Sequence, residues 1–262
     1  MLSYIRTGPT TDLPLVLLHA LPLDSTMWDQ VRELLPDRDI ITVDAPGFGK
    51  SPRGEEFAEG DPAISTYVEA LKARLDDLGV TRMGLAGLSM GGSVAAQFTA
   101  AYPQMVAGLA LIDTNITADD PDRQAFRRNM AERADAGEGY SAVENWTTIM
   151  VGSECTDEVR ASLDARFKVL RNDGLAWIQR ALADRPDSSA AVGMIDGPVF
   201  FVRGMDDPTA SLESYQELGA RCRNPYYVEI PGAGHFTADE KPVELARALD
   251  VFAHATALYA RG

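Results

Sequence analysis

Residues Gly87-Leu88-Ser89-Met90-Gly91 form a G-x-S-x-G motif between an apolar run, residues 83–86, and a helix-like stretch, residues 93–101. Where a strand turns abruptly into a helix, the residue at the turn has a strained backbone, and the residues two positions away must be small. The turn raises the Ser89 hydroxyl above the sheet and leaves the N–H of Met90 free at the helix N-terminus, where it can stabilise negative charge. Ser89 is therefore a candidate nucleophile. The competing interpretation is a glycine-rich turn with an idle serine.

Short apolar runs, typical of strands buried on both faces of a parallel sheet, recur on either side of this motif. They alternate with helical segments, the clearest of which is amphipathic and covers residues 64–78. This alternation indicates right-handed βαβ units, and it predicts an α/β protein with a mostly parallel central sheet flanked by helices. The expected strands are residues 15–18, 40–43, 83–86, 109–112, 198–203 and 226–230, and a last helix is expected over residues 242–258.

Residues 115–194 break the alternation, because strand-like runs are absent and four helical segments follow one another. We therefore expect a helical lid at 115–194, inserted into a core made of residues 1–114 and 195–262. The first lid segment carries several arginines interspersed with Asp and Glu, which favours a solvated helix face over an anion site. The helical segments are residues 122–136, 141–150, 156–170 and 175–182, and the arginines are Arg123, Arg127, Arg128 and Arg133.

A serine hydroxyl attacks a carbonyl only when a base removes its proton, and imidazole has a suitable pKa. The chain has three histidines. His235 lies in a glycine-containing loop directly after the last expected strand, and functional residues of open α/β sheets gather at such strand ends. His19 also closes a strand, but it is expected to brace the neighbouring loop through hydrogen bonds. His254 lies within the last helix, so His235 is the predicted base.

The base needs a buried carboxylate that fixes its tautomer and stabilises its charged form. Asp207 follows the expected strand 198–203 and is the first candidate. Asp206 is its neighbour and would point elsewhere if Asp207 turns inward. Asp113 ends the strand after the nucleophile helix and is a topologically allowed substitute.

The negative oxygen of an acyl-transfer intermediate needs two hydrogen-bond donors about 3 Å away. The N–H of Met90 is the first candidate. The second is expected in the loop after the strand that ends at His19, from Leu21 in the first place and from Ala20 in the second. The alternative is that this loop only connects a strand to a helix.

The composition limits the partners of the chain. A formal net charge of −15 disfavours nucleic acid and anionic membrane surfaces. No apolar run approaches the length that spans a bilayer, and the N-terminus does not resemble a signal peptide, so we expect a cytoplasmic protein. Cys155 and Cys222 form no metal or redox motif, and we expect no metal, no cofactor and a small-molecule substrate.

These motifs together resemble the α/β-hydrolase family, in particular its lidded serine esterases, lactonases and cofactor-free haloperoxidase-like members. The resemblance implies the α/β-hydrolase fold and the family's chain order of nucleophile, acid and base, here Ser89, Asp207 and His235. One departure is Ala20, where the family usually has Gly, because a methyl group narrows the allowed φ range. The matching segments are residues 17–22, 44–51, 87–92, 204–208 and 234–236.

The leading functional prediction is a serine hydrolase that cleaves a small, largely apolar carboxylic ester or lactone through an acyl-enzyme. A second hypothesis is that the same residues act on a carbon–carbon bond or a peptide, as in family members that resemble meta-cleavage-product hydrolases and proline iminopeptidases. A peptidase lid would carry acidic groups for the substrate amine, with Glu138, Glu144 and Glu154 as candidates. A third hypothesis is that the protein is a receptor that binds a small ligand on the same fold and does not hydrolyse it.

Apolar and aromatic lid residues are candidates for lining an acyl pocket, although the same spacing is typical of packing between lid and core. The candidates are Met130, Trp146, Ile149, Met150, Phe167 and Trp177, together with Phe236 next to the expected base.

Overall fold

A seven-stranded sheet runs through the centre of the computed structural model, which describes residues 1–261. The strand order is β1-β3-β2-β4-β5-β6-β7, and every neighbouring pair is parallel except β1 with β3. The strands are β1 (Tyr4–Thr7), β2 (Leu15–Leu18), β3 (Ile40–Val43), β4 (Met83–Leu88), β5 (Val106–Ile112), β6 (Val199–Gly204) and β7 (Pro225–Ile230).

The six strands expected from apolar runs are all present, and the predicted mostly parallel sheet is confirmed. Strands β2, β3, β4 and β5 are buried along their whole length, which is why they read as continuous apolar runs. Strand β1 was not predicted. It is a half-exposed edge strand with no apolar run, so periodicity gives it no signal.

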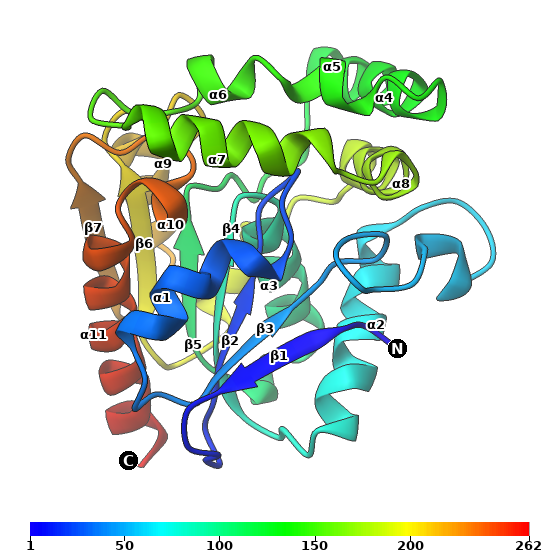
Figure 1. The fold of residues 1–262 in the computed structure, drawn as a ribbon. Coiled ribbons are helices and arrows are strands. Elements are labelled where there is room, and N and C mark those ends of the chain that lie inside the picture. The colour runs from blue at the N-terminus through cyan, green and yellow to red at the C-terminus, as the bar shows by residue number, and fades with distance from the viewer. Residues whose placement is uncertain (262) are drawn as a thin grey trace.

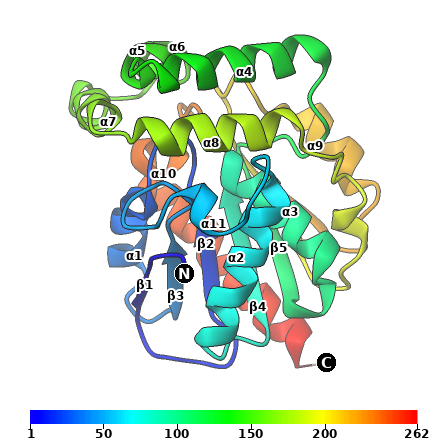
Figure 2. The same ribbon diagram turned by 90° about the vertical axis from the view of Figure 1, so that its right-hand side faces the viewer.

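Helices cover both faces of the sheet, as Figures 1 and 2 show. One face carries α1 (Asp29–Leu34) and α11 (Pro242–Ala260), which pack against each other, and the other carries α2 (Ile64–Asp77) and α3 (Met90–Ala101). Burial of each Val, Leu or Ile side chain between these layers contributes about 1.5–3 kcal/mol. The short elements of the core are η1 (Ser25–Trp28), η2 (Gly54–Glu56), η3 (Pro103–Met105), η4 (Ala191–Gly193), α9 (Leu212–Gly219) and α10 (Thr237–Glu240).

Five further helices, here called the cap helices, lie across the edge of the sheet at which the parallel strands end (Figure 1). The N-cap side chains of Asp120 and Thr156 accept backbone N–H groups at the start of the first and fourth of them. The single helix expected over residues 141–150 is two short helices. The cap helices are α4 (Pro121–Asp135), α5 (Gly139–Val143), α6 (Trp146–Ile149), α7 (Asp157–Lys168) and α8 (Asn172–Ala183).

The cap helices are held closely to the core. The backbones of Gly47 and Gly174 touch, since a Cβ on Gly47 would lie 2.5 Å from the Gly174 Cα. Arg171 Nη1 donates to the carbonyl of Ser51 at 3.0 Å. The cap therefore covers the strand ends, where ligands of parallel α/β sheets bind. None of the helices within residues 1–261 is long and apolar enough to cross a membrane.

Candidate active site

Ser89 lies at the sharp turn between β4 and α3 with a φ of 54°, a backbone conformation that L-residues rarely adopt. The turn is possible because its flanks lack side chains. A Cβ on Gly87 would lie 2.1 Å from the Gly91 carbonyl oxygen, and one on Gly91 would lie 2.3 Å from the Leu18 carbonyl oxygen. The two glycines of the motif are therefore required by close backbone contacts, and the turn presents the Ser89 hydroxyl at the strand ends.

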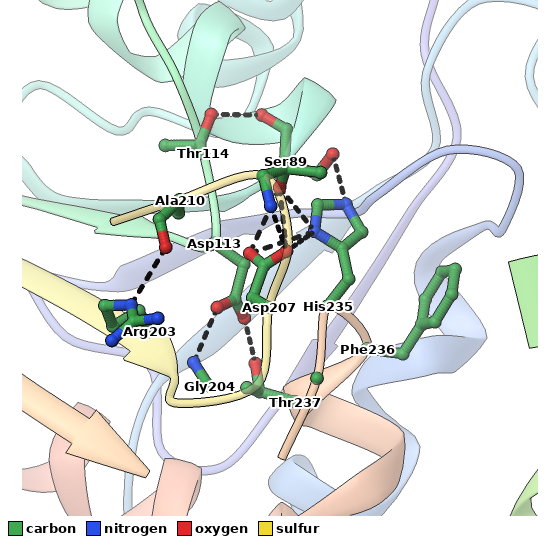
Figure 3. Close-up of polar contacts among 12 residues, drawn as sticks. Ser89, Asp113, Thr114, Arg203, Gly204, Asp207, Ala210, His235, Phe236 and Thr237 are labelled. Carbon is green, nitrogen blue, oxygen red and sulfur yellow. Dashed lines mark hydrogen bonds and ion pairs between the residues drawn. The ribbon is translucent and has the colours of Figure 1, made fainter. Parts of the chain in front are cut away.

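His235 follows β7 and lies between Ser89 and Asp207, as Figure 3 shows. Its Nε2 is 2.8 Å from the Ser89 hydroxyl oxygen, and its Nδ1 is 3.2 Å from each carboxylate oxygen of Asp207. Ser89 and Asp207 are 118 positions apart in the sequence, and Asp207 and His235 are 28 apart, yet hydrogen bonds connect all three side chains. With Nδ1 bonded to Asp207, Nε2 is free to accept the serine proton.

Thr209 contacts both Asp207 and His235, and the sequence analysis did not identify it. Its N–H and hydroxyl donate to Asp207 Oδ1 at 2.8 and 2.9 Å, and its hydroxyl oxygen is 3.0 Å from His235 Nδ1. Burial would raise the pKa of Asp207, but the electrostatic interaction of its carboxylate with His235 and the hydrogen bonds from His235 and Thr209 outweigh burial, so the pKa is lowered. Asp207 is thereby kept ionised beside the imidazole.

The two alternative acids are placed differently. Asp206 is exposed and accepts hydrogen bonds from the N–H and hydroxyl of Ser153 at 2.8 and 2.6 Å. Asp113 is buried and accepts the N–H of Gly204 at 2.7 Å and the hydroxyl of Thr237 at 2.6 Å (Figure 3). Burial, with the charge of Asp207 as a second cause, raises the pKa of Asp113 well above its usual value. Neither carboxylate is bonded to His235.

Neither of the other two histidines is hydrogen-bonded to Ser89 or Asp207. His19 is buried, its Nδ1 donates to the carbonyl of Ala20 at 3.0 Å, and its Nε2 accepts the N–H of Ala45 at 2.9 Å. Burial lowers the pKa of His19, which keeps this bridge between two loops neutral. His254 is exposed on α11.

Two backbone N–H groups beside Ser89 are without acceptors. Within residues 1–261, neither the N–H of Met90 nor that of Leu21 makes a hydrogen bond, and both residues line the same cavity as Ser89. The N–H of Ala20 contacts the Met27 sulfur at 3.1 Å instead. Among the described residues, Ser89 and Asp113 are the non-glycine residues with positive φ. Ala20 therefore has a negative φ, and its methyl group causes no backbone strain of the left-handed kind.

Glu240 of α10 is a buried carboxylate that sequence reasoning missed. Its Oε2 accepts the N–H groups of Gly152 and Gly234 at 2.6 and 3.0 Å, and its Oε1 accepts that of Phe236 at 3.0 Å. Burial raises the pKa of Glu240, although these three N–H groups oppose the shift. The carboxylate fixes the backbone on both sides of His235 and ties it to the cap.

We expect Glu240→Gln to lower the free energy of unfolding by about 1–3 kcal/mol, because an amide NH₂ would face one of the three N–H groups and leave it unsatisfied. Denaturant titration of both proteins measures this difference. Glu244→Gln, which changes an exposed carboxylate in the first turn of α11, is the matched control. Equal stability of Glu240→Gln and the unchanged protein would contradict the assignment.

A cavity of about 730 Å³ opens above Ser89 and His235, between the core and the cap helices. Trp146, Ile149 and Met150 contribute apolar surface to it, as the sequence suggested. The lining also contains charged groups, so the expected pocket is apolar only in part. The charged residues of the lining besides Asp113 are Asp119, Asp120, Arg123, Arg127 and Arg185.

Several residues expected at this pocket do not line it, and these predictions are wrong. Trp177 packs against Gly54, where a Cβ would lie 2.2 Å from the indole ring. Phe236 points away from Ser89 and Asp207, as Figure 3 shows. It packs on Phe167, with ring centroids 5.6 Å apart. Met130 is buried between α4 and α8, with its sulfur 3.4 Å from the Gln179 amide nitrogen.

The acidic candidates for a peptidase amine site also lie elsewhere. Glu138, Glu144 and Glu154 are exposed and do not line the cavity, and Glu154 pairs with Lys241 at 2.6 Å. Within the described residues, no group of three His, Cys, Asp or Glu side chains is arranged to hold a metal ion.

Comparison with known proteins gives consistent matches. The family model of the alpha/beta hydrolase fold matches residues 14–242. A thermophilic esterase from Thermogutta terrifontis, solved with malate bound, is 28% identical over 97% of this chain and 93% of its own, with a TM-score of 0.88. A putative 2-succinyl-6-hydroxy-2,4-cyclohexadiene-1-carboxylate synthase of Bacillus subtilis is 26% identical over 90% of this chain and 88% of its own. The fold is shared with an enol-lactonase of Burkholderia xenovorans at 22% identity over 96% and 95% of the two chains, with a TM-score of 0.80.

Proposed function

The chain belongs to the α/β-hydrolase family, and we propose that it cleaves a small carboxylic ester or lactone through an acyl-enzyme formed on Ser89. The observation that supports this most directly is the 2.8 Å distance between the Ser89 hydroxyl and His235 Nε2, beside a cavity of about 730 Å³, which is large enough for a small molecule. The family match and the similarity to an esterase both indicate that the enzyme is a hydrolase.

In the proposed reaction, His235 Nε2 accepts the hydroxyl proton while the Ser89 oxygen bonds to the substrate carbonyl carbon. Asp207 stabilises the positive charge on the imidazole. The N–H groups of Met90 and Leu21 donate to the carbonyl oxygen as it becomes negative. His235 then returns the proton to the departing alcohol oxygen, and a water molecule repeats the sequence to release the acid and regenerate the Ser89 hydroxyl.

A fluorophosphonate tests this proposal, because it reacts with a serine only when a neighbouring base activates the hydroxyl. We expect one adduct on the peptide that contains Ser89, and we expect the untreated protein to hydrolyse p-nitrophenyl acetate. This hydrolysis should fall in proportion to the fraction of protein that is labelled. Heat-denatured protein is the control and should stay unlabelled. An intact protein that neither labels at Ser89 nor hydrolyses the ester would overturn the proposal.

A further inference from the structure

Two buried arginines share one carboxylate in the cavity wall. Asp119 Oδ1 accepts Arg185 Nη2 at 2.8 Å, and Asp119 Oδ2 accepts Arg127 Nε. Arg185 Nε also donates to the carbonyl of Thr117 at 2.9 Å, and Arg127 Nη1 donates to Gln179 Oε1 at 3.1 Å. The sequence predicted a solvated face for the arginines of α4. For Arg127 this is wrong, because the helix packs on α8 and directs this side chain inward.

The charges in this cluster do not balance. The Arg127, Arg185 and Asp119 side chains are 10%, 5% and 5% exposed, so two positive charges face one negative charge away from bulk water. Burial, with the neighbouring Arg127 as a second cause, lowers the pKa of Arg185 to about 10, which still leaves it charged at neutral pH. Buried charges that lack a partner are costly, and an added anion would supply one.

Each guanidinium keeps a donor that no protein acceptor uses. Within residues 1–261, Arg127 Nη2 and Arg185 Nη1 make no hydrogen bond, and neither atom is among those sealed from solvent. Both residues line the cavity that holds Ser89 and His235. A planar guanidinium recognises a carboxylate through such paired N–H groups.

The local sign of charge is also opposite to that of the whole chain. The formal net charge is −15, which repels anions at long range, whereas the charged cavity wall formed by Arg123, Arg127 and Arg185 with Asp119 and Asp120 has one positive charge in excess. Burial raises the pKa of Asp113, the other carboxyl of the cavity, which disfavours its ionised form there. An anionic ligand is thus favoured within this cavity specifically.

We propose that Arg127 and Arg185 bind a carboxylate of the substrate, so that the preferred ester or lactone carries a carboxylate group in addition to its scissile bond. The inference rests on the proposed function and narrows it to a substrate class. The apolar residues Trp146, Ile149 and Met150 then contact the hydrocarbon segment between the two polar groups.

Matched pairs of esters test the preference. Monoethyl adipate and ethyl hexanoate place a carboxylate or a methyl group at the end of the acyl chain, and 4-acetoxybutanoate and butyl acetate do the same on the alcohol side. We expect kcat/KM for the anionic ester to exceed that for the neutral one by about tenfold or more in one of the pairs, mainly through KM. Proton release in a pH-stat measures all four without a chromophore.

Arg185→Met is expected to reduce that anionic-to-neutral ratio by about 10- to 100-fold, and Arg127→Met should do the same. Each single variant leaves one arginine to pair with Asp119, so no buried carboxylate is orphaned. Arg128→Met is the matched control, because Arg128 is adjacent on α4 but points outward to Asp184 at 2.6 Å. A ratio that is unchanged in both cavity variants would overturn the proposal.

Adipate has no bond to be hydrolysed, so its binding measures carboxylate recognition by Arg127 and Arg185 independently of catalysis. Calorimetry should show adipate binding to the unchanged protein and to Arg128→Met, with a Kd weakened about tenfold or more in Arg185→Met. Adipate binding without hydrolysis of any ester would refute the proposed function and still support the anion site. Ester hydrolysis with no preference in either pair and no adipate binding would refute the anion site alone.

Discussion

Replacement of His235 by alanine is expected to lower kcat for ester hydrolysis by about 10⁴- to 10⁶-fold, and to abolish labelling by the fluorophosphonate. His235 Nε2 is the acceptor that lies 2.8 Å from the Ser89 hydroxyl, and within residues 1–261 no other side-chain base contacts that oxygen. Without the imidazole, the hydroxyl keeps its proton and remains a poor nucleophile. Steady-state kinetics and intact-mass measurement of the adduct provide the two readouts.

His254→Ala is the control for this experiment, since His254 is exposed on α11 and does not line the cavity that holds Ser89. It should retain the kcat and the labelling of the unchanged protein. Circular dichroism on both variants separates a chemical effect from unfolding. If folded His235→Ala retained more than about a tenth of kcat, the catalytic role of this residue would be rejected.

The proximity of the three candidate residues was predictable because they follow elements with strong sequence signals. Ser89, Asp207 and His235 each follow a strand with an apolar run, and the carboxyl ends of parallel strands meet at one edge of a sheet. Topology alone therefore predicts that they lie near one another. The choice of Asp207 over Asp113 needed side-chain direction, which follows from contacts with Thr209 and with Gly204 and Thr237 that no motif encodes.

The pocket was harder to predict because it depends on how the cap helices face the core. Met130 and Arg127 are three positions apart on α4 and both turn toward α8, although one is apolar and the other charged. The helix is polar on most of its surface, so its pattern does not show which side is buried. Trp177 has the composition of a pocket residue but fills the space above Gly54 instead. Residue type gives the chemistry that a cap can supply, whereas helix packing selects which residues supply it.

Asp207→Asn is expected to lower kcat by about 10⁴-fold with little change in structure. The N–H of Thr209, 2.8 Å from Asp207 Oδ1, would hold the amide oxygen. The amide NH₂ would then face His235 Nδ1 and donate to it, which places the imidazole proton on Nε2. In that tautomer Nε2 cannot accept the Ser89 proton, so the variant fails at the first chemical step. Kinetics at a fixed substrate concentration far above KM measure the loss.

Asp113→Asn provides the matched comparison, because it changes the other buried aspartate of the same cluster. Its amide oxygen can accept the Gly204 N–H, and its NH₂ can donate to the Thr237 hydroxyl oxygen, so kcat should fall by less than about tenfold. The pKa of Asp113 is raised in the folded state, so the protonated carboxyl adds to the free energy of unfolding at low pH. This contribution is lost as the pH rises through the folded-state pKa. The Asp113→Asn variant has no such loss, and its Tm relative to the unchanged protein should therefore increase from acid to neutral pH. Were Asp113→Asn to lose as much kcat as Asp207→Asn, the acid of the catalytic group would have to be reassigned to the pair of carboxyls acting together.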